Sequence, residues 1–446
     1  MRISRLKRVG SGVLAAAIAA STYVGAALPA SARTAGKDGS AEMNEAYAAH
    51  ESLMPIGPSF SSATILEWTP ESDPDARYSR ASIPLANRTG GFIVNPKANP
   101  EAKLMLCSLA NSAHDTTGAQ GTDNFMSWSF NYWQYADSFV YWSGSKEGII
   151  TCPTGEFTDA AHANGVPVVA TLGFPWGTGT GYVEEVRAFT QQAEDGSFPV
   201  ADKLIEVMEY YGFDGYFFNQ ESFGCSAEDA TKLNEMMKYM RKKCPDILIS
   251  WYDAMVPSGG ISHQDAVNDQ NKAWMEPDAE GNYCVDEFFM NYNWYESEIS
   301  TTINTMNSIN RSPFDAYAGL DVQQNGMNTG FRDYMLLDAN GKMKLSFALY
   351  CPNSTLGISA SGEEFHKNER TFYVNKVSDP RVETSDPTIA ANSEWVGMSR
   401  FFADKTPITS APFVTNFNSG HGKGYWVDGV LSRDREWSYQ SNQDIM

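Results

Sequence analysis

The sequence is poor in cysteine and histidine, and these shortages argue against several kinds of site. Its 446 residues include six cysteines and six histidines. The cysteines contain no CxxC pair and the histidines form no HExxH motif, so we expect no metal and no other cofactor. An even number of cysteines permits disulfides, but their wide scatter differs from the dense pattern of a disulfide scaffold.

Positive charge and long apolar runs are also scarce. Lys and Arg number 33 against 54 Asp and Glu, which gives a formal net charge of −21 at pH 7. An acidic surface repels nucleic acid and anionic membranes, so neither is expected as a partner. No strand is followed by a glycine-rich phosphate fingerprint, which disfavours a nucleotide-binding enzyme. No segment after the N-terminal region is apolar for long enough to span a membrane.

The N-terminal segment has the residue order of a secretory signal. Basic residues precede an apolar stretch of small residues from about Val13 to Leu28, and Ala30-Ser31-Ala32 follows. A membrane anchor is the alternative, but polar residues interrupt the stretch, which is shorter than the roughly 20 residues of a spanning helix. We therefore expect residues 1–32 to be a signal peptide. The protein is then secreted or extracellular, or attached to the cell surface through a C-terminal region that this chain lacks.

Composition divides the rest of the chain into three parts. Residues 33–60 are rich in Ala, Ser, Gly and Glu and are predicted to form a linker. Residues 61–405 alternate about eight apolar runs with helical patterns, as in Val166–Phe174, which predicts an α/β fold, a (β/α)8 TIM barrel. Residues 406–446 change to short runs separated by Gly, Asn, Ser and Asp. They predict the start of a β-rich, sandwich-like accessory domain that is truncated here.

The first candidate catalytic residues directly follow the strand predicted at Phe213–Phe218. Asn219 and Glu221 are two positions apart, so both point to one face of an extended chain, at the barrel mouth where catalysis is built. A carboxyl group beside aromatic residues can serve as a general acid, whereas a capping or solvated loop glutamate is the alternative. Asp214 lies seven positions earlier, on the opposite face and roughly 23 Å away along the strand, and is expected to be structural.

An amide beside an acid, rather than two acids, suits one mode of glycoside hydrolysis. In substrate-assisted catalysis the 2-acetamido oxygen of the sugar attacks the anomeric carbon, and no protein nucleophile is needed. The next predicted strand ends at Tyr252, whose hydroxyl could bond the acetamido oxygen or the oxazolinium that develops. An ordinary half-buried tyrosine is the alternative there.

Other strand ends carry amides and aromatic rings, which suit sugars because C–H faces stack on rings and hydroxyls need polar partners. Most aromatic residues in any chain belong to the core, so we expect only a minority to touch a ligand. The candidate sugar contacts are Trp142, Trp176, Asn291, Asn293 and Trp294.

Together these residues resemble glycoside hydrolase family 85. The segment Asp214–Glu221 is similar to the family's catalytic strand with its Asn-x-Glu. It is also similar to the DGxDxDxE strand of family 18 chitinases, but Phe217 and Asn219 stand where those enzymes have aspartates. Further segments fit family 85: 66–70, 139–143, 164–168, 251–253 and 289–294.

The resemblance implies an endo-β-N-acetylglucosaminidase that acts on N-linked glycans of glycoproteins or glycopeptides. Such an enzyme cleaves the β-1,4 bond of the N,N'-diacetylchitobiose core with retention and leaves one N-acetylglucosamine on the protein. The resemblance implies that Glu221 acts as acid and then base, that Asn219 orients the acetamido group, and that Tyr252 assists. A hydrolase of chitin-type N-acetylhexosaminides and a non-catalytic glycan-binding barrel are the alternatives.

Overall fold

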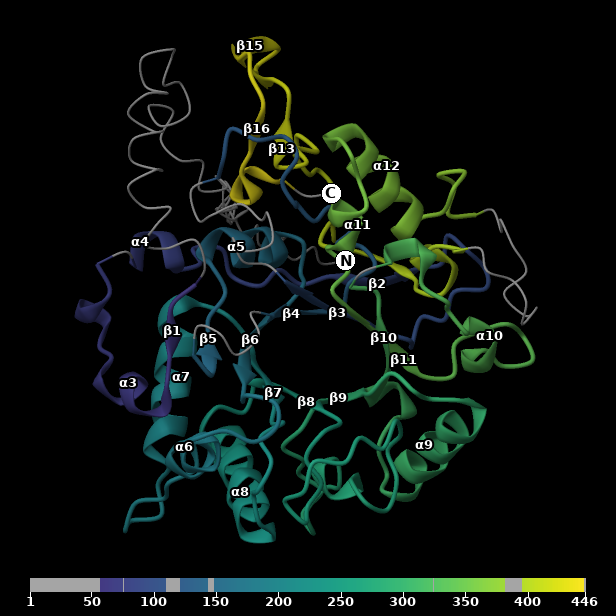
Figure 1. Ribbon diagram of the computed structural model, residues 1–446. Helices are drawn as coiled ribbons and strands as arrows, with labels where there is room; N and C mark the ends of the chain where they lie inside the picture. Colours follow the sequence, from purple (N-terminus) through teal and green to yellow (C-terminus); the bar gives the residue numbers. More distant parts are fainter. Residues whose placement is uncertain are drawn as a thin grey trace, which may run out of the picture.

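The computed structural model describes residues 57–74, 76–109, 121–142, 148–323, 325–381 and 395–444. The predicted signal peptide, residues 1–32, and most of the predicted linker lie outside these residues. Within them, a ten-stranded sheet contains a barrel whose parallel strands pair in a closed ring, because the last barrel strand pairs with the first (Figure 1). The barrel strands are β3 (Leu104–Leu109), β4 (Ser138–Trp142), β6 (Val168–Gly173), β7 (Gly215–Asn219), β8 (Leu248–Tyr252), β9 (Glu287–Met290), β10 (Ala316–Asp321) and β11 (Ser346–Tyr350). The predicted (β/α)8 barrel is confirmed.

Helices lie outside the barrel and begin and end where the sequence directs them. Pro199 opens α7 and Gly212, with a φ of 79°, closes it in the left-handed conformation that glycine adopts easily. The side chain of Ser226 caps α8 together with Asp229. Between β8 and β9 the described chain has only the 3-10 helix η3 (Lys272–Trp274). The helices after the barrel strands are α5 (Gly155–Ala163), α6 (Tyr182–Phe189), α7 (Pro199–Tyr211), α8 (Ala227–Lys243), α9 (Glu296–Ser308), α10 (Asp333–Leu336), α11 (Ser354–Gly357) and α12 (Gly362–Tyr373).

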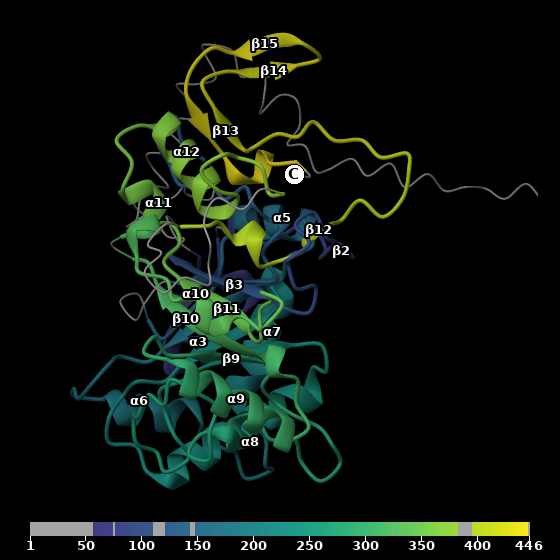
Figure 2. The ribbon, with the colours of Figure 1, turned by 90° about the vertical axis from the view of Figure 1, so that its right-hand side faces the viewer.

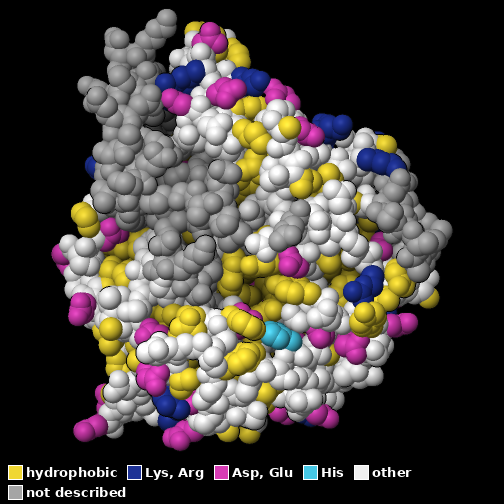
Figure 3. Space-filling model, in the orientation of Figure 1, with side chains coloured by type: hydrophobic (Ala, Val, Ile, Leu, Met, Phe, Trp, Pro, Cys, Tyr) yellow, Lys and Arg dark blue, Asp and Glu magenta, His cyan; other side chains and the backbone are white. Residues whose placement is uncertain are grey.

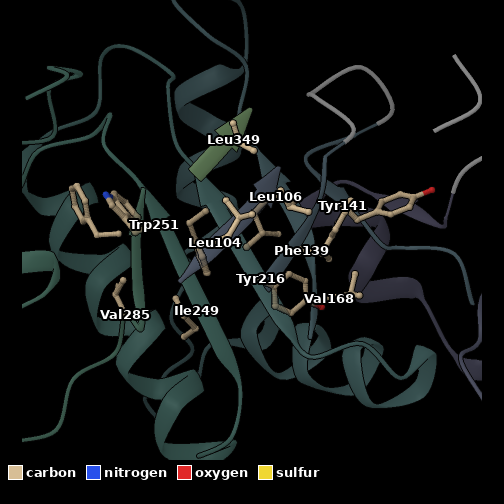
Figure 4. Close-up of a cluster of buried hydrophobic side chains, with 14 of the residues drawn as sticks. Leu104, Leu106, Phe139, Tyr141, Val168, Tyr216, Ile249, Trp251, Val285 and Leu349 are labelled. Carbon is tan, nitrogen blue, oxygen red and sulfur yellow. The ribbon is translucent and has the colours of Figure 1, made fainter. Parts of the chain in front are cut away.

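Strand alternation divides the core into two layers. On β7, Tyr216 and Phe218 pack in the large cluster between strands and helices, whereas Phe217 packs in a smaller cluster inside the barrel. Figure 4 shows members of the outer layer, among them Tyr216 and Trp251, on neighbouring strands. The inner cluster takes one or two residues from each barrel strand, including Phe289 and Tyr317. Side chains therefore fill the barrel, and a substrate can enter only at its mouth.

Short elements surround the barrel at both ends of the described chain. The elements before the barrel are β1 (Ser59–Phe60), α3 (Ser62–Glu67), η1 (Pro70–Ser72), α4 (Ala76–Ser79) and β2 (Thr89–Phe92). Strand β5 (Ile150–Thr151), between β4 and β6 in the chain, pairs antiparallel with both β1 and β6. Further 3-10 helices are η4 (Pro313–Asp315), η5 (Gly326–Asn328), η6 (Met398–Arg400) and η7 (Gln440–Asn442). None of the helices in the described ranges combines the length and apolar character needed to cross a bilayer.

The C-terminal segment is rich in β-structure, as the composition predicts. The strands after the barrel are β12 (Asp404–Thr406), β13 (His421–Gly422), β14 (Tyr425–Val427), β15 (Val430–Arg433) and β16 (Trp437–Ser438). They form three two-stranded antiparallel sheets, one of them with β2. Figure 2 shows the β14–β15 hairpin at the end of the molecule opposite α8 and α9. Gln440 and Gln443 fasten this segment to the chain before β4 through hydrogen bonds to the carbonyl of Phe130.

Candidate active site

The ends of β7, β8 and β9 bring the predicted catalytic side chains together. Because Phe217 points into the barrel, Asn219 at the end of β7 points the same way, and Glu221 follows two residues later. The Asn219 Nδ2 donates to Glu221 Oε2 over 3.0 Å, so the two side chains lie side by side as predicted. Asp214, at the other end of β7, accepts from the Val168 amide and contacts His162, which is the structural position expected for it.

Glu221 is partly buried, and both of its carboxyl oxygens have a nitrogen neighbour. Its side chain is 18% exposed, and His263 Nε2 lies 3.3 Å from Oε1. The backbone carbonyl of Glu221 accepts from the Gly177 amide over 3.0 Å, which ties the loop after β7 to the loop after β6. The carboxyl group is thus fixed at the barrel mouth while part of it remains open to solvent.

Asn219 has an unused acceptor. The side chain is 5% exposed, and its Oδ1 is a buried oxygen without a hydrogen-bond partner in the described part of the chain. A buried polar atom without a partner is unfavourable unless a ligand or water supplies one. Since Nδ2 already donates to Glu221, Oδ1 is left to accept from an N–H group of a bound molecule.

Tyr252 belongs to a buried chain of polar groups. Its hydroxyl donates to Asn291 Oδ1 over 2.8 Å, and Asn291 Nδ2 donates to Asp265 Oδ1 over 2.7 Å. Burial, followed by the nearby charges of Glu221 and Asp253, raises the pKa of Tyr252. The tyrosine therefore stays protonated over the neutral range and its hydroxyl remains a donor.

Three residues of the site, Asp253, His263 and Asp265, were not predicted from the sequence. Asp253 follows β8 directly and is 1% exposed. Its Oδ2 accepts from the amides of Gln264 and Asp265 over 3.0 and 2.6 Å. Burial raises the pKa of Asp253 to about 7, against the lowering effect of these bonds. The polar cluster at residues 262–265, ten positions beyond β8, was the one signal available in the sequence.

The predicted sugar contacts have different surroundings. Trp142 is half-buried and meets Phe217 edge-on, with ring centroids 6.0 Å apart. Trp176 is 68% exposed and packs edge-on against Phe223 at 5.7 Å. Trp142 is the last residue of β4 and Trp176 follows the end of β6, so a sugar ring at the barrel mouth could reach both.

The residues after β9 were predicted as a group, but the structure separates them. Asn291 is buried and engaged with Tyr252, whereas Asn293 is exposed and donates its backbone N–H to Asp265. Trp294 is only 3% exposed, and its Nε1 donates to the Gly319 carbonyl over 2.7 Å. Its ring packs in the outer core layer, so the structure does not bring Trp294 to the mouth as a sugar contact.

The surface at one end of the barrel suits an uncharged, amphipathic ligand. On the face shown in Figure 3, hydrophobic side chains gather around the middle, a histidine lies beside them, and Lys and Arg are sparse. Among the described residues, no group of three or more His, Cys, Asp or Glu is arranged to hold a metal ion.

Curated proteins with similar sequences carry one activity in their names. The chain is 27% identical over 394 residues to "Cytosolic endo-beta-N-acetylglucosaminidase" of Gallus gallus, a match that covers 85% of this chain and 47% of the relative. The human protein of the same name is also 27% identical, over 85% of this chain and 46% of its own length. The chain therefore spans about half the length of the curated relatives it matches.

These names correct the predicted location. The relatives from chicken, human and also Arabidopsis thaliana are called cytosolic, which contradicts the expected secretion and signal peptide. The prediction rested on the order of basic, apolar and small residues in positions 1–32, which lie outside the described residues. All six cysteines are free thiols in the structure.

A solved structure and a family model agree with the sequence relatives. The glycoside hydrolase domain of Endo-D from Streptococcus pneumoniae R6 is 37% identical, with a TM-score of 0.81 over 88% of this chain and 61% of that one. The sequence model described as glycosyl hydrolase family 85 matches residues 110–425, a span that includes Asn219, Glu221 and Tyr252. The chain therefore belongs to glycosyl hydrolase family 85.

Proposed function

We propose that this chain is an endo-β-N-acetylglucosaminidase that cleaves the β-1,4 bond of the N,N'-diacetylchitobiose core of N-glycans. The observation that carries the proposal is the Asn219–Glu221 pair: an amide with a free buried acceptor beside a partly buried carboxyl group. The names of the curated relatives support the same activity, and the similarity to the glycoside hydrolase domain of Endo-D supports a glycoside hydrolase.

In the first step Glu221 is the general acid. It gives its proton to the glycosidic oxygen while the acetamido oxygen of the sugar attacks the anomeric carbon, which breaks the glycosidic bond and forms an oxazolinium ion. Asn219 accepts the acetamido N–H at Oδ1, so the carbonyl oxygen is turned toward the anomeric carbon. The Tyr252 hydroxyl donates its proton to Asn291, so its oxygen is the end of the group that can stabilise the positive charge that develops.

In the second step Glu221 is the general base. Its carboxylate takes a proton from water, the water oxygen attacks the anomeric carbon, and the oxazolinium ring reopens to the acetamido group. Two inversions leave the anomeric configuration retained. The carboxylates of the segment after β8 are already occupied: Asp253 and Asp265 accept backbone and amide N–H groups, which supports a mechanism without a protein nucleophile.

Trp142 and Trp176 are the proposed sugar-stacking residues because they offer ring surface at the strand ends. Asn293 is a proposed hydrogen-bonding contact on the exposed loop after β9. Neutral aromatic and amide groups suit glycans whatever their overall size.

The test is mass spectrometry of an Asn-linked high-mannose glycopeptide, a complex-type glycopeptide and a chitin oligomer, each incubated with the protein. We expect at least one glycopeptide to lose its glycan except for a single N-acetylglucosamine. Faster hydrolysis of the chitin oligomer than of both glycopeptides would favour the chitin-type alternative. Binding of all three without any change in mass would favour a non-catalytic glycan-binding barrel.

A further inference from the structure

His263 is in contact with the reacting group, although only its place in the polar cluster at residues 262–265 could have marked it in the sequence. Its Nε2 lies 3.3 Å from Glu221 Oε1, and its side chain is 30% exposed. The imidazole ring also lies against Tyr252, with ring centroids 5.7 Å apart. The histidine therefore contacts two of the side chains that the proposed mechanism uses, Glu221 and Tyr252.

The backbone that carries His263 is held tightly. After β8 the chain forms a hairpin-like loop in which Met255 and Ile261 form an antiparallel bridge. The Ser262 amide donates to the Ala254 carbonyl over 2.8 Å. Gly259 closes its tip with a φ of 88°. The next two residues after His263 donate their amides to the buried Asp253 carboxylate. Hydrogen bonds on both sides thus fix the position of the imidazole relative to Glu221.

The two oxygens of Glu221 consequently differ. Oε2 accepts one hydrogen bond from the Asn219 amide, on the side where that residue has its free acceptor. Oε1 faces the His263 ring nitrogen. When the imidazole carries its proton on Nε2, that N–H points at Oε1, which leaves no room for a second proton between the two atoms. The acidic proton of the carboxyl group is then placed on Oε2, whose hydroxyl oxygen keeps a lone pair that accepts from the Asn219 amide.

We propose that His263 is a positioning residue that directs the catalytic proton of Glu221 to Oε2, the oxygen beside Asn219. This inference rests on the proposed function and deepens it. In the acid step the Oε2 proton goes to the glycosidic oxygen, and the carboxylate that forms keeps the His263 Nε2–H on Oε1. In the base step water returns a proton to Oε2, so the pair ends each cycle as it began.

The charges around the imidazole are consistent with this pairing. The hydrogen bond to Glu221 is the largest influence and raises the pKa of His263, while burial of the ring opposes it. Asp253 and Asp265, from the same segment, raise it further. Tyr252 faces the ring from β8 and stays protonated. Loss of the Glu221 charge should therefore lower the pKa of His263 measurably.

The kinetic test compares H263L, which removes the donor, with H263Q, which keeps an N–H donor that does not titrate. We expect H263L to lower kcat on the glycopeptide about 10- to 100-fold with KM changed less than about threefold, because a bond to an ionised group is lost in the reacting centre. H263Q should recover kcat to within about fivefold of wild type. H366Q, which removes an imidazole from α12, is the matched control and should keep full activity. Full kcat in H263L, or equal losses in H263L and H263Q, would overturn the proposal.

The second measurement needs no substrate. Proteins labelled with 15N-histidine, wild type and E221Q, are titrated by NMR, and the His263 signals are assigned by their absence in H263Q. We expect the Nε2–H tautomer above the pKa of the imidazole, and a lower pKa in E221Q than in wild type because the hydrogen bond to a charged carboxylate is lost. An Nδ1–H tautomer, or a pKa that does not move, would overturn the pairing. Since the protein is measured alone, this result judges His263 even if the glycopeptide is not cleaved.

Discussion

At the residue scale, the site depends on one carboxyl group whose two oxygens have different neighbours. Asn219 occupies one side of Glu221 and His263 the other. An amide cannot titrate in the physiological range, whereas an imidazole can. Because the Asn219 amide does not titrate, it can keep its hydrogen bond to Glu221 while the carboxyl group changes between its acid and base forms.

Replacement of Glu221 by Gln should abolish turnover without loss of glycan binding. Gln has the same shape but neither gives nor takes the catalytic proton, and general acid–base catalysis contributes typically ~10²–10⁴-fold. We expect kcat to fall at least about 100-fold, and calorimetric titration to give a glycan affinity within a few-fold of wild type. E228Q, an exposed change on α8, is the matched control and should match wild type in both assays. Near wild-type turnover in E221Q would remove Glu221 from the mechanism.

The sequence predicts the place of a site residue only where the neighbouring residues in the chain determine it. Asn219 and Glu221 were predicted because strand alternation fixes their direction within five residues of Phe217. Trp294 lies beyond the end of β9, where alternation no longer applies, and its indole turned out to donate into the core. His263 reaches Glu221 only through the hydrogen bonds of a non-local loop, which no local pattern reports.

At the scale of elements, the loops after β6 and β7 act as one surface. The Gly177 amide donates to the Glu221 carbonyl, the Phe223 amide donates to the Gly177 carbonyl, and the Ser222 hydroxyl donates to the Pro175 carbonyl over 2.8 Å. These bonds hold the exposed rings of Trp176 and Phe223 in edge contact. A sugar stacked there would be held at a fixed distance from the acid.

Trp176→Ala should weaken substrate binding and leave folding unchanged. The side chain is 68% exposed, so little core packing is lost, whereas a stacking surface for a sugar disappears. We expect KM for the glycopeptide to rise about 3- to 10-fold with an unchanged melting temperature, since aromatic contacts are worth roughly 0.5–1.5 kcal/mol. Trp426→Ala, 58% exposed on the β14–β15 hairpin, is the control and should alter neither value. An unaltered KM in Trp176→Ala would mean that the substrate does not stack on the Trp176 ring.

Gly259→Ala should disturb the segment that carries His263. Its φ of 88° is strained for alanine, and an added Cβ would lie 2.2 Å from the Ser226 carbonyl at the start of α8. We expect a loss of about 1–3 kcal/mol in the free energy of unfolding by urea titration, together with a lower kcat. Gly260→Ala is the matched control because its Cβ would meet nothing closer than 3.8 Å. Equal stability and kcat in the two variants would show that the loop tolerates displacement.

The order of strands and helices was predictable because buried parallel strands are continuous apolar runs. The all-buried β6 and the capped α8 are examples. The chain between β8 and β9 departs from the barrel pattern, since the described residues there hold a 3-10 helix and the hairpin-like loop. Its course depends on one buried aspartate, Asp253, whose role appears only when the fold is complete.

At the scale of the whole molecule, the C-terminal β-rich segment contacts the barrel domain partly through two histidines, of which His421 is buried and His366 half-buried. His421 on β13 is 5% exposed, and neither ring nitrogen has a partner in the described residues. The His366 ring on α12 lies 4.3 Å away in an edge-on arrangement. Burial, and then His366, lowers the pKa of His421 to about 3.

This burial predicts a loss of stability in acid. The folded pKa lies below the ordinary value of 6.5, so the unfolded chain binds the proton more readily and stability falls as the pH drops from about 6.5 toward 3. One such histidine costs about 1.4 kcal/mol per pH unit. Between pH 7 and pH 5, wild type should therefore lose about 2 kcal/mol more than H421F in the free energy of unfolding by urea.

Other buried groups change with pH in the opposite sense, but they are common to both proteins. Burial raises the pKa values of Asp253 and Glu287, whose stabilising contribution is present in acid and lost as the pH rises through their folded pKa. The comparison of wild type with H421F removes them. If the free energy of unfolding changed equally with pH in wild type and H421F, His421 could not be a buried neutral histidine.

The measurement that tests the central claim most directly is 1H NMR of an N-glycopeptide during the first minutes of cleavage. Substrate-assisted hydrolysis by Asn219 and Glu221 predicts that the new reducing N-acetylglucosamine of the released glycan appears first as the β-anomer and then equilibrates to the α-anomer. The α-anomer appearing first would mean inversion and a second catalytic carboxylate, and release of a glycan bearing both core sugars would mean that a different bond is cut.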